Sequence, residues 1–327
     1  MKGDIVKKTR LLFALVVIVV MGLAMTACSG GSTSSKTVKL AASDEFFTNV
    51  DANPAFEKTY GYTLTKDQEV RLAGGNTAQT ETAVAEGTDG VNFGMAYGTD
   101  GALADLGLVV LADDKGAQPV YWPCPITRKE IVDKYPDIEE LLKGPFDGLT
   151  LEKLQELNGR IQVGGEAADA VASSYLESGG YTSASAPTQS KGTITVGSKI
   201  DTEGELLSSI IKLKLEDAGY KVVDKSQTGT TDVVRKALLD GEIDIYPEYT
   251  GSGLLFFPSV DPAIFKDGEQ GYQEVKKLDL EQNNVVWLTP ARANNTWAIA
   301  TKKDFAEKEG LKTMSDFAAY VNASQKQ

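Results

Sequence analysis

The chain has 327 residues, of which 46 are acidic and 33 basic, so its formal net charge is −13. This acidity disfavours nucleic acid as a partner, because proteins bind nucleic acid through basic residues that neutralise phosphates. The sequence contains no histidine, which excludes Ser-His-Asp and Cys-His catalysis in their usual forms and removes the commonest metal ligand. It also has no P-loop and no Gly-x-Ser-x-Gly motif. The usual equipment of an enzyme is therefore missing, and we expect no catalytic residue, metal or cofactor, although these absences alone do not exclude an enzyme.

The N-terminus has the features of an exported, lipid-anchored protein. Basic residues up to Arg10 precede an apolar run, 11–23, that is too short to cross a bilayer, which takes about 20 apolar residues. Small residues stand directly before Cys28, as in the lipobox of bacterial lipoproteins, and a Gly/Ser-rich stretch follows it. We expect residues 1–27 to be a signal peptide, Cys28 to carry the lipid, and residues 28–36 to be a flexible tether. The alternative is an ordinary secretory signal.

Cys124 is the only other cysteine in the sequence. It has no partner if Cys28 is acylated, so we expect no disulfide bond and a fold that is stabilised by a hydrophobic core. We expect Cys124 itself to be a small buried residue within that core.

Along the rest of the chain, short apolar runs alternate with helical patterns, which is typical of an α/β fold with largely parallel sheets. In the N-terminal half, residues 77–86 read as a helix that Gly87 ends. Residues 91–96 then read as a strand that leads into Tyr97. Further on, residues 179–192 are small and polar, include a proline and show no apolar period, so we predict an interior linker.

The clearest unit begins directly after this linker, with a strand over 193–197. Thr202 stands three residues before Glu205, a capping-box spacing that predicts a helix from there to Gly219. The following strand, helix and strand are expected at 220–223, 230–240 and 243–246. Tyr249 comes shortly after the last strand, and ligands of open α/β sheets bind beyond the carboxyl ends of strands. The pattern alone leaves open that both tyrosines follow strands by chance.

Several motifs in this unit and after it are similar to those of one family. Residues 193–253 resemble the opening half of the substrate-binding lipoproteins of osmoprotectant ABC importers, which take up glycine betaine, carnitine or choline. The resemblance rests on the sequences VGSK at 196–199, VVRKALLDGEID at 233–244 and YPEYTG at 246–251. Residues 286–288, 294–300 and 311–317 look like that family's middle section.

The motifs that this family places last come first in this chain. They are SDEF at 43–46, YGTDG at 97–101 and LVVLADDKG at 108–116, and all precede residue 190. The resemblance therefore covers nearly all of the mature chain in circularly permuted order, with the linker at 179–192 joining the family's usual ends. Such a rearrangement costs little where termini are exposed and close together.

The resemblance implies a two-lobed periplasmic-binding-protein fold, type II-like, with mixed or parallel sheets, flanking helices and a hinge between the lobes. One lobe is expected to contain residues 98–297, including the linker. The other is expected to combine residues 37–97 with 298–327. Strands near Tyr97 and Trp297 would then form the hinge.

The same resemblance assigns a binding site. A quaternary ammonium has no N–H to donate, so it is held by aromatic ring faces, each contributing about 0.5–2 kcal/mol when desolvated. Tyr249 and Tyr97 match aromatic positions of the family, and Trp297 stands where the family usually has tyrosine. Asn295, two residues before Trp297, is included in the site.

The remaining family positions give mixed signals about the ligand. Lys199 matches a lysine that contacts a betaine carboxylate, and Ser252 stands where a ligand-binding threonine is common. A fourth aromatic position falls near Glu81, whose carboxylate would favour a cation without a carboxylate of its own. The family arginine falls near Asn49, so that charge is missing.

These features lead to one functional hypothesis and several alternatives. We expect an extracytoplasmic, lipid-anchored monomer that captures a quaternary-ammonium osmoprotectant and passes it to the membrane permease of an ABC importer. The first alternative is the same fold binding another small zwitterion or an amino acid. A sensor domain and, less favoured, a lipid-anchored enzyme are the others.

Overall fold

The computed structural model describes residues 36–72, 77–183 and 190–326. Residues 38–326 belong to one structural unit. The predicted signal peptide, Cys28 and nearly all of the predicted tether lie outside the described residues. Within the described part of the chain, no helix has the length and apolar character needed to cross a membrane.

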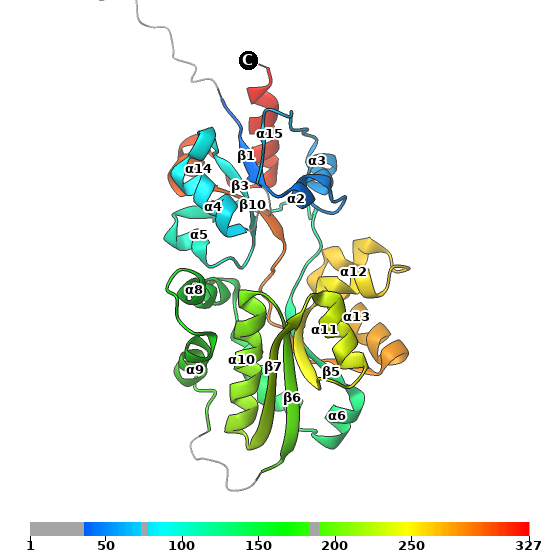
Figure 1. Ribbon diagram of the computed structural model, residues 1–327. Coiled ribbons are helices and arrows are strands. Elements are labelled where there is room, and N and C mark those ends of the chain that lie inside the picture. Colours follow the sequence, from blue (N-terminus) through cyan, green and yellow to red (C-terminus); the bar gives the residue numbers. More distant parts are fainter. Residues whose placement is uncertain (1–35, 73–76, 184–189, 327) are drawn as a thin grey trace, which may run out of the picture. The chain divides into compact units, whose positions relative to one another are not determined.

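A first five-stranded sheet has the order β2-β1-β3-β10-β4. β1 runs parallel to both β2 and β3, whereas β10 runs antiparallel to β3 and β4. We call this sheet and the helices around it the β1 lobe (Figure 1). Its strands are β1 (Leu40–Ala42), β2 (Glu69–Arg71), β3 (Phe93–Tyr97), β4 (Leu108–Val110) and β10 (Trp297–Lys302). Its helices are α2 (Asp44–Thr48), α3 (Asn53–Tyr60), α4 (Thr77–Glu86), α5 (Ala102–Asp105), α14 (Lys303–Glu309) and α15 (Met314–Ser324), with the 3-10 turn η1 (Thr88–Gly90).

A second five-stranded sheet has the order β7-β6-β8-β5-β9. β6 is parallel to β7 and β8, and β5 is antiparallel to β8 and β9. This sheet and its helices form the β6 lobe (Figure 1). Its strands are β5 (Pro123–Arg128), β6 (Gly192–Lys199), β7 (Tyr220–Gly229), β8 (Ile245–Tyr249) and β9 (Val285–Trp287). Its helices are α6 (Lys129–Lys134), α7 (Ile138–Asp147), α8 (Leu151–Gln162), α9 (Ala168–Ser178), α10 (Thr202–Asp217), α11 (Thr231–Leu239), α12 (Gly253–Phe256) and α13 (Gly268–Asn283), with the 3-10 turns η2 (Thr250–Ser252) and η3 (Pro262–Lys266).

Apolar side chains fill both faces of each sheet. In the β6 lobe, one core joins α7, α8, α9 and α10 to β6, and a second joins α11 and α13 to β5 and β9. In the β1 lobe, a core rich in phenylalanine joins α2, α3 and α15 to the sheet, and α4 and α5 cover the other face. Two mixed sheets with helices on both faces confirm the predicted two-lobed α/β fold class.

The two sheets share one design. In each, three strands that follow one another in the chain lie side by side, and a strand from a remote part of the sequence separates them from the fourth. The remote strand is β10 in the β1 lobe and β5 in the β6 lobe, and each is antiparallel to its neighbours. The remote strands are therefore the points where the chain enters a lobe from the other one.

The observed lobe boundary differs from the predicted one at residues 97–98. β4 follows Tyr97 in the chain but pairs with β10, so it stays in the β1 lobe. The segment after β4 also stays there, since the Gln118 side chain donates to the Ala52 carbonyl. The crossing between lobes therefore lies near Tyr121 rather than near Tyr97. The second crossing ends at Trp297, which is the first residue of β10 and so lies in the β1 lobe rather than in the lobe expected over 98–297.

Individual elements follow the sequence pattern closely. The helix predicted over 77–86 has those limits, and Gly87 after it adopts φ +69°. Helix α10 begins one residue earlier than a Thr202 cap would require, because Asp201 is the N-cap and its Oδ1 accepts from the Gly204 amide at 2.6 Å. Cys124 lies in β5, fully buried as expected, and its thiol contacts the Leu288 carbonyl at 3.0 Å.

The described part of the predicted linker packs on the β6 lobe. The Tyr181 ring lies 5.6 Å from the ring of Tyr175 in α9. The Ser183 amide donates to the Asp217 carboxylate at 2.9 Å. These contacts hold the start of the linker beside α9 and α10, and the linker leads from α9 into β6.

Candidate functional site

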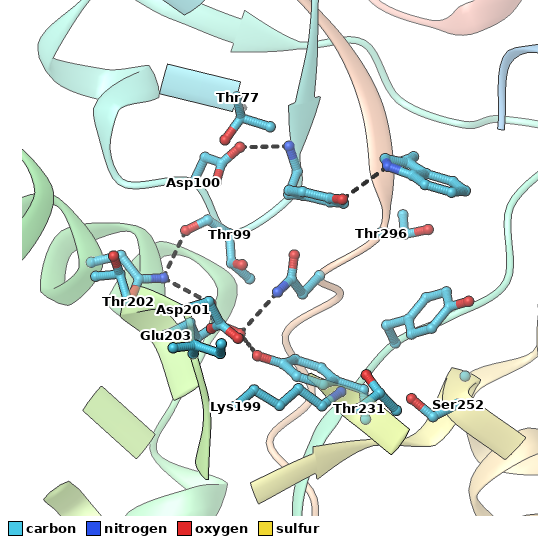
Figure 2. Close-up of a pocket in the computed structure, with 18 of the residues that line it drawn as sticks. Thr77, Thr99, Asp100, Lys199, Asp201, Thr202, Glu203, Thr231, Ser252 and Thr296 are labelled. Carbon is cyan, nitrogen blue, oxygen red and sulfur yellow. Dashed lines mark hydrogen bonds between the residues drawn. The ribbon is translucent and has the colours of Figure 1, made fainter. Parts of the chain in front are cut away.

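A pocket of about 1030 Å³ is lined by residues of both lobes. Figure 2 shows Thr77 and Asp100 of the β1 lobe on one side of it and Lys199, Glu203 and Ser252 of the β6 lobe on the other. The lining also includes the segments where the chain crosses between the lobes. Further lining residues are Asp51, Tyr97, Thr99, Tyr121, Asn158, Gln162, Asp201, Tyr249, Gly251, Leu255, Asn295, Thr296 and Trp297.

Strand ends place the main side chains of the pocket. Tyr97, Lys199 and Tyr249 are the last residues of β3, β6 and β8, and Trp297 is the first residue of the antiparallel strand β10. Because carboxyl ends of parallel strands meet at one edge of a sheet, these residues gather where ligands of α/β proteins usually bind.

Tyr97 and Trp297 form a stacked aromatic pair. They are directly opposite each other in the β3–β10 register, and their ring centroids lie 6.4 Å apart with 17° between the planes. The Trp297 Nε1–H donates to the Tyr97 hydroxyl at 3.0 Å, and buried Phe46 packs edge-on against the indole. Tyr97 is 36% exposed, so the pair offers open aromatic surface to the pocket.

The Tyr249 ring, by contrast, already has a cation over it. The Lys199 ammonium lies 4.7 Å from the ring centroid and forms an ion pair with Glu248, which is fully buried. Glu248 also accepts from the Tyr249 amide at 2.8 Å and from the Ser252 hydroxyl at 2.9 Å. Lys199 is therefore engaged within the protein by both a carboxylate and an aromatic face.

Glu203 is the centre of a buried polar network that reaches both lobes. Its carboxylate accepts from the Tyr249 hydroxyl at 2.8 Å, from Asn158 Nδ2 at 2.7 Å and from Asn295 Nδ2 at 3.1 Å. Asn158 also donates to the Thr99 carbonyl of the β1 lobe at 3.0 Å. Burial raises the pKa of Glu203, because the charged form loses its hydration.

A pair of carboxyl groups, Glu81 and Asp100, lies near Tyr97. Asp100 lines the pocket, and its Oδ2 accepts from the Tyr97 amide at 2.6 Å. Glu81 is only 1% exposed and is not among the lining residues. Burial, followed by the charge of Asp100, raises the pKa of Glu81 to about 9, and burial also raises the pKa of Asp100. Near neutral pH, Glu81 is therefore protonated.

The structure brings together the predicted site residues, with one exception. Tyr249, Trp297, Tyr97, Ser252, Lys199 and Asn295 all line the pocket. Glu81 does not, because it is on the inner face of α4 and packs behind Asp100. Cys28, the predicted lipidation site, lies outside the described residues.

Tyr121 is a lining aromatic residue that the sequence analysis missed. Its amide donates to Asn294 Oδ1 at 2.8 Å, and its carbonyl accepts from the Asn295 amide at 3.0 Å. Its ring packs against Gly251, where a Cβ atom would lie 2.6 Å from the ring. The crossing segments therefore hold Tyr121 in place. The sequence feature that could have indicated it is the pair of neighbouring aromatic residues, Tyr121 and Trp122, just before β5.

Comparisons with known proteins agree on one family. The family described as the substrate binding domain of ABC-type glycine betaine transport system matches residues 26–178 and 192–327. The chain is 53% identical over 137 residues to the glycine betaine-binding protein YehZ of Escherichia coli, a stretch that covers 42% of this chain and 45% of that protein. It is 37% identical over 133 residues to a glycine-betaine-binding protein of Pseudomonas aeruginosa, covering 41% of this chain and 42% of that protein.

A solved structure of a relative also matches about half of this chain. The structure of apo YehZ from E. coli matches with 49% sequence identity and a TM-score of 0.41, over 45% of this chain and 52% of that one. The chain thus covers about half of the length of the relatives that it matches. The family match is interrupted between residues 178 and 192, within the predicted linker.

Proposed function

The chain belongs to the family of substrate binding domains of ABC-type glycine betaine transport systems, and on this premise we propose that it captures a quaternary-ammonium solute and delivers it to the permease of an ABC importer. The members of this family are binding components of transporters, not enzymes, and they work outside the cytoplasm. The observation that carries the proposal is the stacked Tyr97–Trp297 pair, which lines a pocket between two lobes.

The chemistry of the pocket suits such a ligand. A quaternary ammonium needs electron-rich ring faces and negative charge, and it makes no demand for hydrogen-bond acceptors at its head. Tyr97, Trp297 and Tyr121 offer rings, and Asp100 adds a carboxylate behind Tyr97. Closure of the two lobes around the ligand would desolvate these contacts and strengthen them.

We include anchoring and delivery in the same proposal. Acylation of Cys28 would hold the protein at the outer face of the cell membrane, and residues 28–36 would give it reach. A single closed protein with bound solute would then dock on the permease as a monomer. Metabolic labelling with a palmitate analogue tests the anchor, and Cys28→Ser should abolish the incorporation.

The direct test of the ligand class is titration calorimetry of the full chain with glycine betaine, choline and carnitine. We expect saturable binding of at least one of them. Trp297→Ala should weaken that binding by about 10- to 30-fold, since one desolvated cation–π contact contributes up to about 2 kcal/mol.

Trp297→Phe is the matched control, because it keeps an aromatic face but removes the N–H that reaches Tyr97. It should retain most of the affinity. If none of the three solutes binds, or if the alanine and phenylalanine variants bind alike, the aromatic-cage proposal is wrong.

A further inference from the structure

The basic side chain that lines the described pocket is already paired within the protein. Lys199 is the only lysine or arginine among the described residues that line it. Its ammonium is paired with Glu248 and covers the Tyr249 ring, and its side chain is only 13% exposed. Glu248 is held in turn by the Tyr246 hydroxyl at 3.0 Å and by Ser252. A ligand carboxylate that approached Lys199 would therefore meet Glu248 as well, and like charges repel.

Acidic groups, in contrast, face the pocket from both lobes. Asp51 and Asp100 line it from the β1 lobe, and Asp201 and Glu203 line it from the β6 lobe. Asp201 caps α10 and Asp100 accepts from Tyr97, so two of these carboxylates are also fixed in place. In a partly desolvated pocket this arrangement favours a cation and opposes the carboxylate of a zwitterion.

Three uncharged polar side-chain atoms of the described lining residues, Asn158 Oδ1, Asn295 Oδ1 and Thr296 Oγ1, have no hydrogen-bond partner. Asn295 Oδ1 and Thr296 Oγ1 are buried and have no hydrogen-bond partner within the described part of the chain, and both residues line the pocket beside Trp297. The Asn295 amide is oriented by its Nδ2, which donates to Glu203. Asn295 Oδ1 is an acceptor, so it needs an O–H or N–H donor from the ligand, and a carboxylate has none to give.

From these three observations we propose that the pocket selects a quaternary-ammonium cation that carries a hydroxyl group and no carboxylate, with choline as the representative. The proposal rests on the function proposed above and narrows its substrate class. The trimethylammonium head lies against Tyr97 and Trp297, and the hydroxyl donates to Asn295 Oδ1. Lys199 is an internal cation that covers the Tyr249 face and pairs with Glu248, so glycine betaine finds no free ammonium for its carboxylate.

Calorimetric titration of the full chain with three probes tests this assignment. The probes are choline, its O-methyl ether, which keeps the charge but loses the donor, and glycine betaine. We expect choline to bind at least about tenfold more tightly than glycine betaine, and the ether to bind about three- to tenfold more weakly than choline, as expected for one lost hydrogen bond.

Glu248→Gln provides a specificity switch. It keeps the shape of the side chain but releases the charge of Lys199, so the choline preference over glycine betaine should fall by about tenfold. Glu307→Gln, an exposed acid-to-amide change outside the pocket, should leave the preference unchanged. The melting temperature of each variant shows whether it is folded. The relative affinities of the unmodified protein for choline and glycine betaine test the proposal even if a variant fails to fold.

The outcomes separate this proposal from the one on which it rests. Tighter binding of glycine betaine than of choline would overturn the carboxylate-free assignment and leave the quaternary-ammonium function standing. Equal binding of choline and its ether would overturn the role of Asn295. Failure of all three probes to bind would overturn both proposals.

Discussion

At the scale of single residues, the Glu81–Asp100 pair makes the stability of the fold depend on pH. Burial raises the pKa of Glu81 from 4.5 to about 9 and also raises that of Asp100. Above pH 4.5 the unfolded chain has released the Glu81 proton, whereas the folded protein keeps it up to about pH 9. The stability linked to this proton is complete below pH 4.5 and is lost as the pH rises toward 9.

We predict that Glu81→Gln raises the melting temperature at pH 8.5, because an amide fills the site without a proton to lose. A gain of about 2–4 °C is reasonable for a contribution near 1 kcal/mol in a domain of this size. At pH 4.5 the gain should disappear. Scanning calorimetry at both values measures it, with exposed Glu86→Gln on the same helix as the control. A gain of equal size at both pH values would contradict the pKa shift.

Single residues also show which parts of the site could be predicted from the sequence. Motifs identified Tyr249 and Trp297, and both line the pocket. The sequence did not reveal that Lys199 pairs with Glu248, because that contact depends on how β6 lies against β8. Glu203 was missed for a similar reason, since its partners come from α8, β8 and the crossing segment. Side-chain pairs that form only through tertiary contacts cannot be recognised from the local sequence.

At the scale of elements, helix α8 forms a row of contacts with the β1 lobe. Gln155, Asn158 and Gln162 are spaced so that they share one helix face. Gln155 donates to the Gly98 carbonyl at 2.8 Å, Asn158 donates to the Thr99 carbonyl, and Gln162 accepts from the Gly101 amide at 3.1 Å. All three side chains form hydrogen bonds with the backbone of residues 98–101, the segment that follows Tyr97 and contains Asp100. The row therefore ties α8 of the β6 lobe to the segment of the β1 lobe that carries Asp100 of the pocket.

We predict that Gly101→Ala weakens ligand binding by at least about tenfold. Its backbone conformation suits alanine, but a Cβ there would lie 2.0 Å from the Gly159 amide nitrogen and would push α5 away from α8. Gly144→Ala is the control, since its Cβ would make ordinary contact with Tyr181 at 3.4 Å. Titration of both variants with the best-binding solute measures the effect. Unchanged affinity in Gly101→Ala would show that this contact is not needed.

Elements with strong local signals were predicted well, and ambiguous ones were not. Gly87 and Gly219 have positive φ and follow the helices that they were expected to end. The apolar run at β4 could belong to either sheet, and only its pairing with β10 decides the matter. The predicted lobe boundary was therefore wrong at β4, because the sequence of this strand does not show which sheet it joins.

At the scale of the whole unit, the two ends of the described chain meet at one residue. The Gln68 carbonyl accepts from the Leu40 amide at 2.8 Å, and Gln68 Oε1 accepts from Gln325 Nε2 at 2.8 Å. Figure 1 shows the C-terminal end of α15 close to the start of β1. Ends that lie this close agree with the interpretation that the family order is permuted here, because a short connection can join them.

We predict that a rearranged chain folds and binds as the natural one does. It would begin at residue 192, continue to 326, pass through a short Gly/Ser linker to residue 38 and end at 178. Affinity should stay within about twofold and the melting temperature within a few degrees, since loop closure depends only weakly on length. A chain opened at Val234, in the buried face of α11, is the control that should fail. Loss of folding in the first chain would refute the permutation.

Cys124 has a further consequence for how this protein can be used. It is fully buried against Leu288, and burial raises the pKa of its thiol well above the ordinary value, so thiol reagents react with it poorly. In a Cys28→Ser background, a cysteine introduced at Leu255, a pocket residue that is 58% exposed, would be the one accessible thiol of the described chain. A fluorescent dye attached there would sit at the mouth of the pocket and turn the protein into a reagentless optical sensor for its own solute.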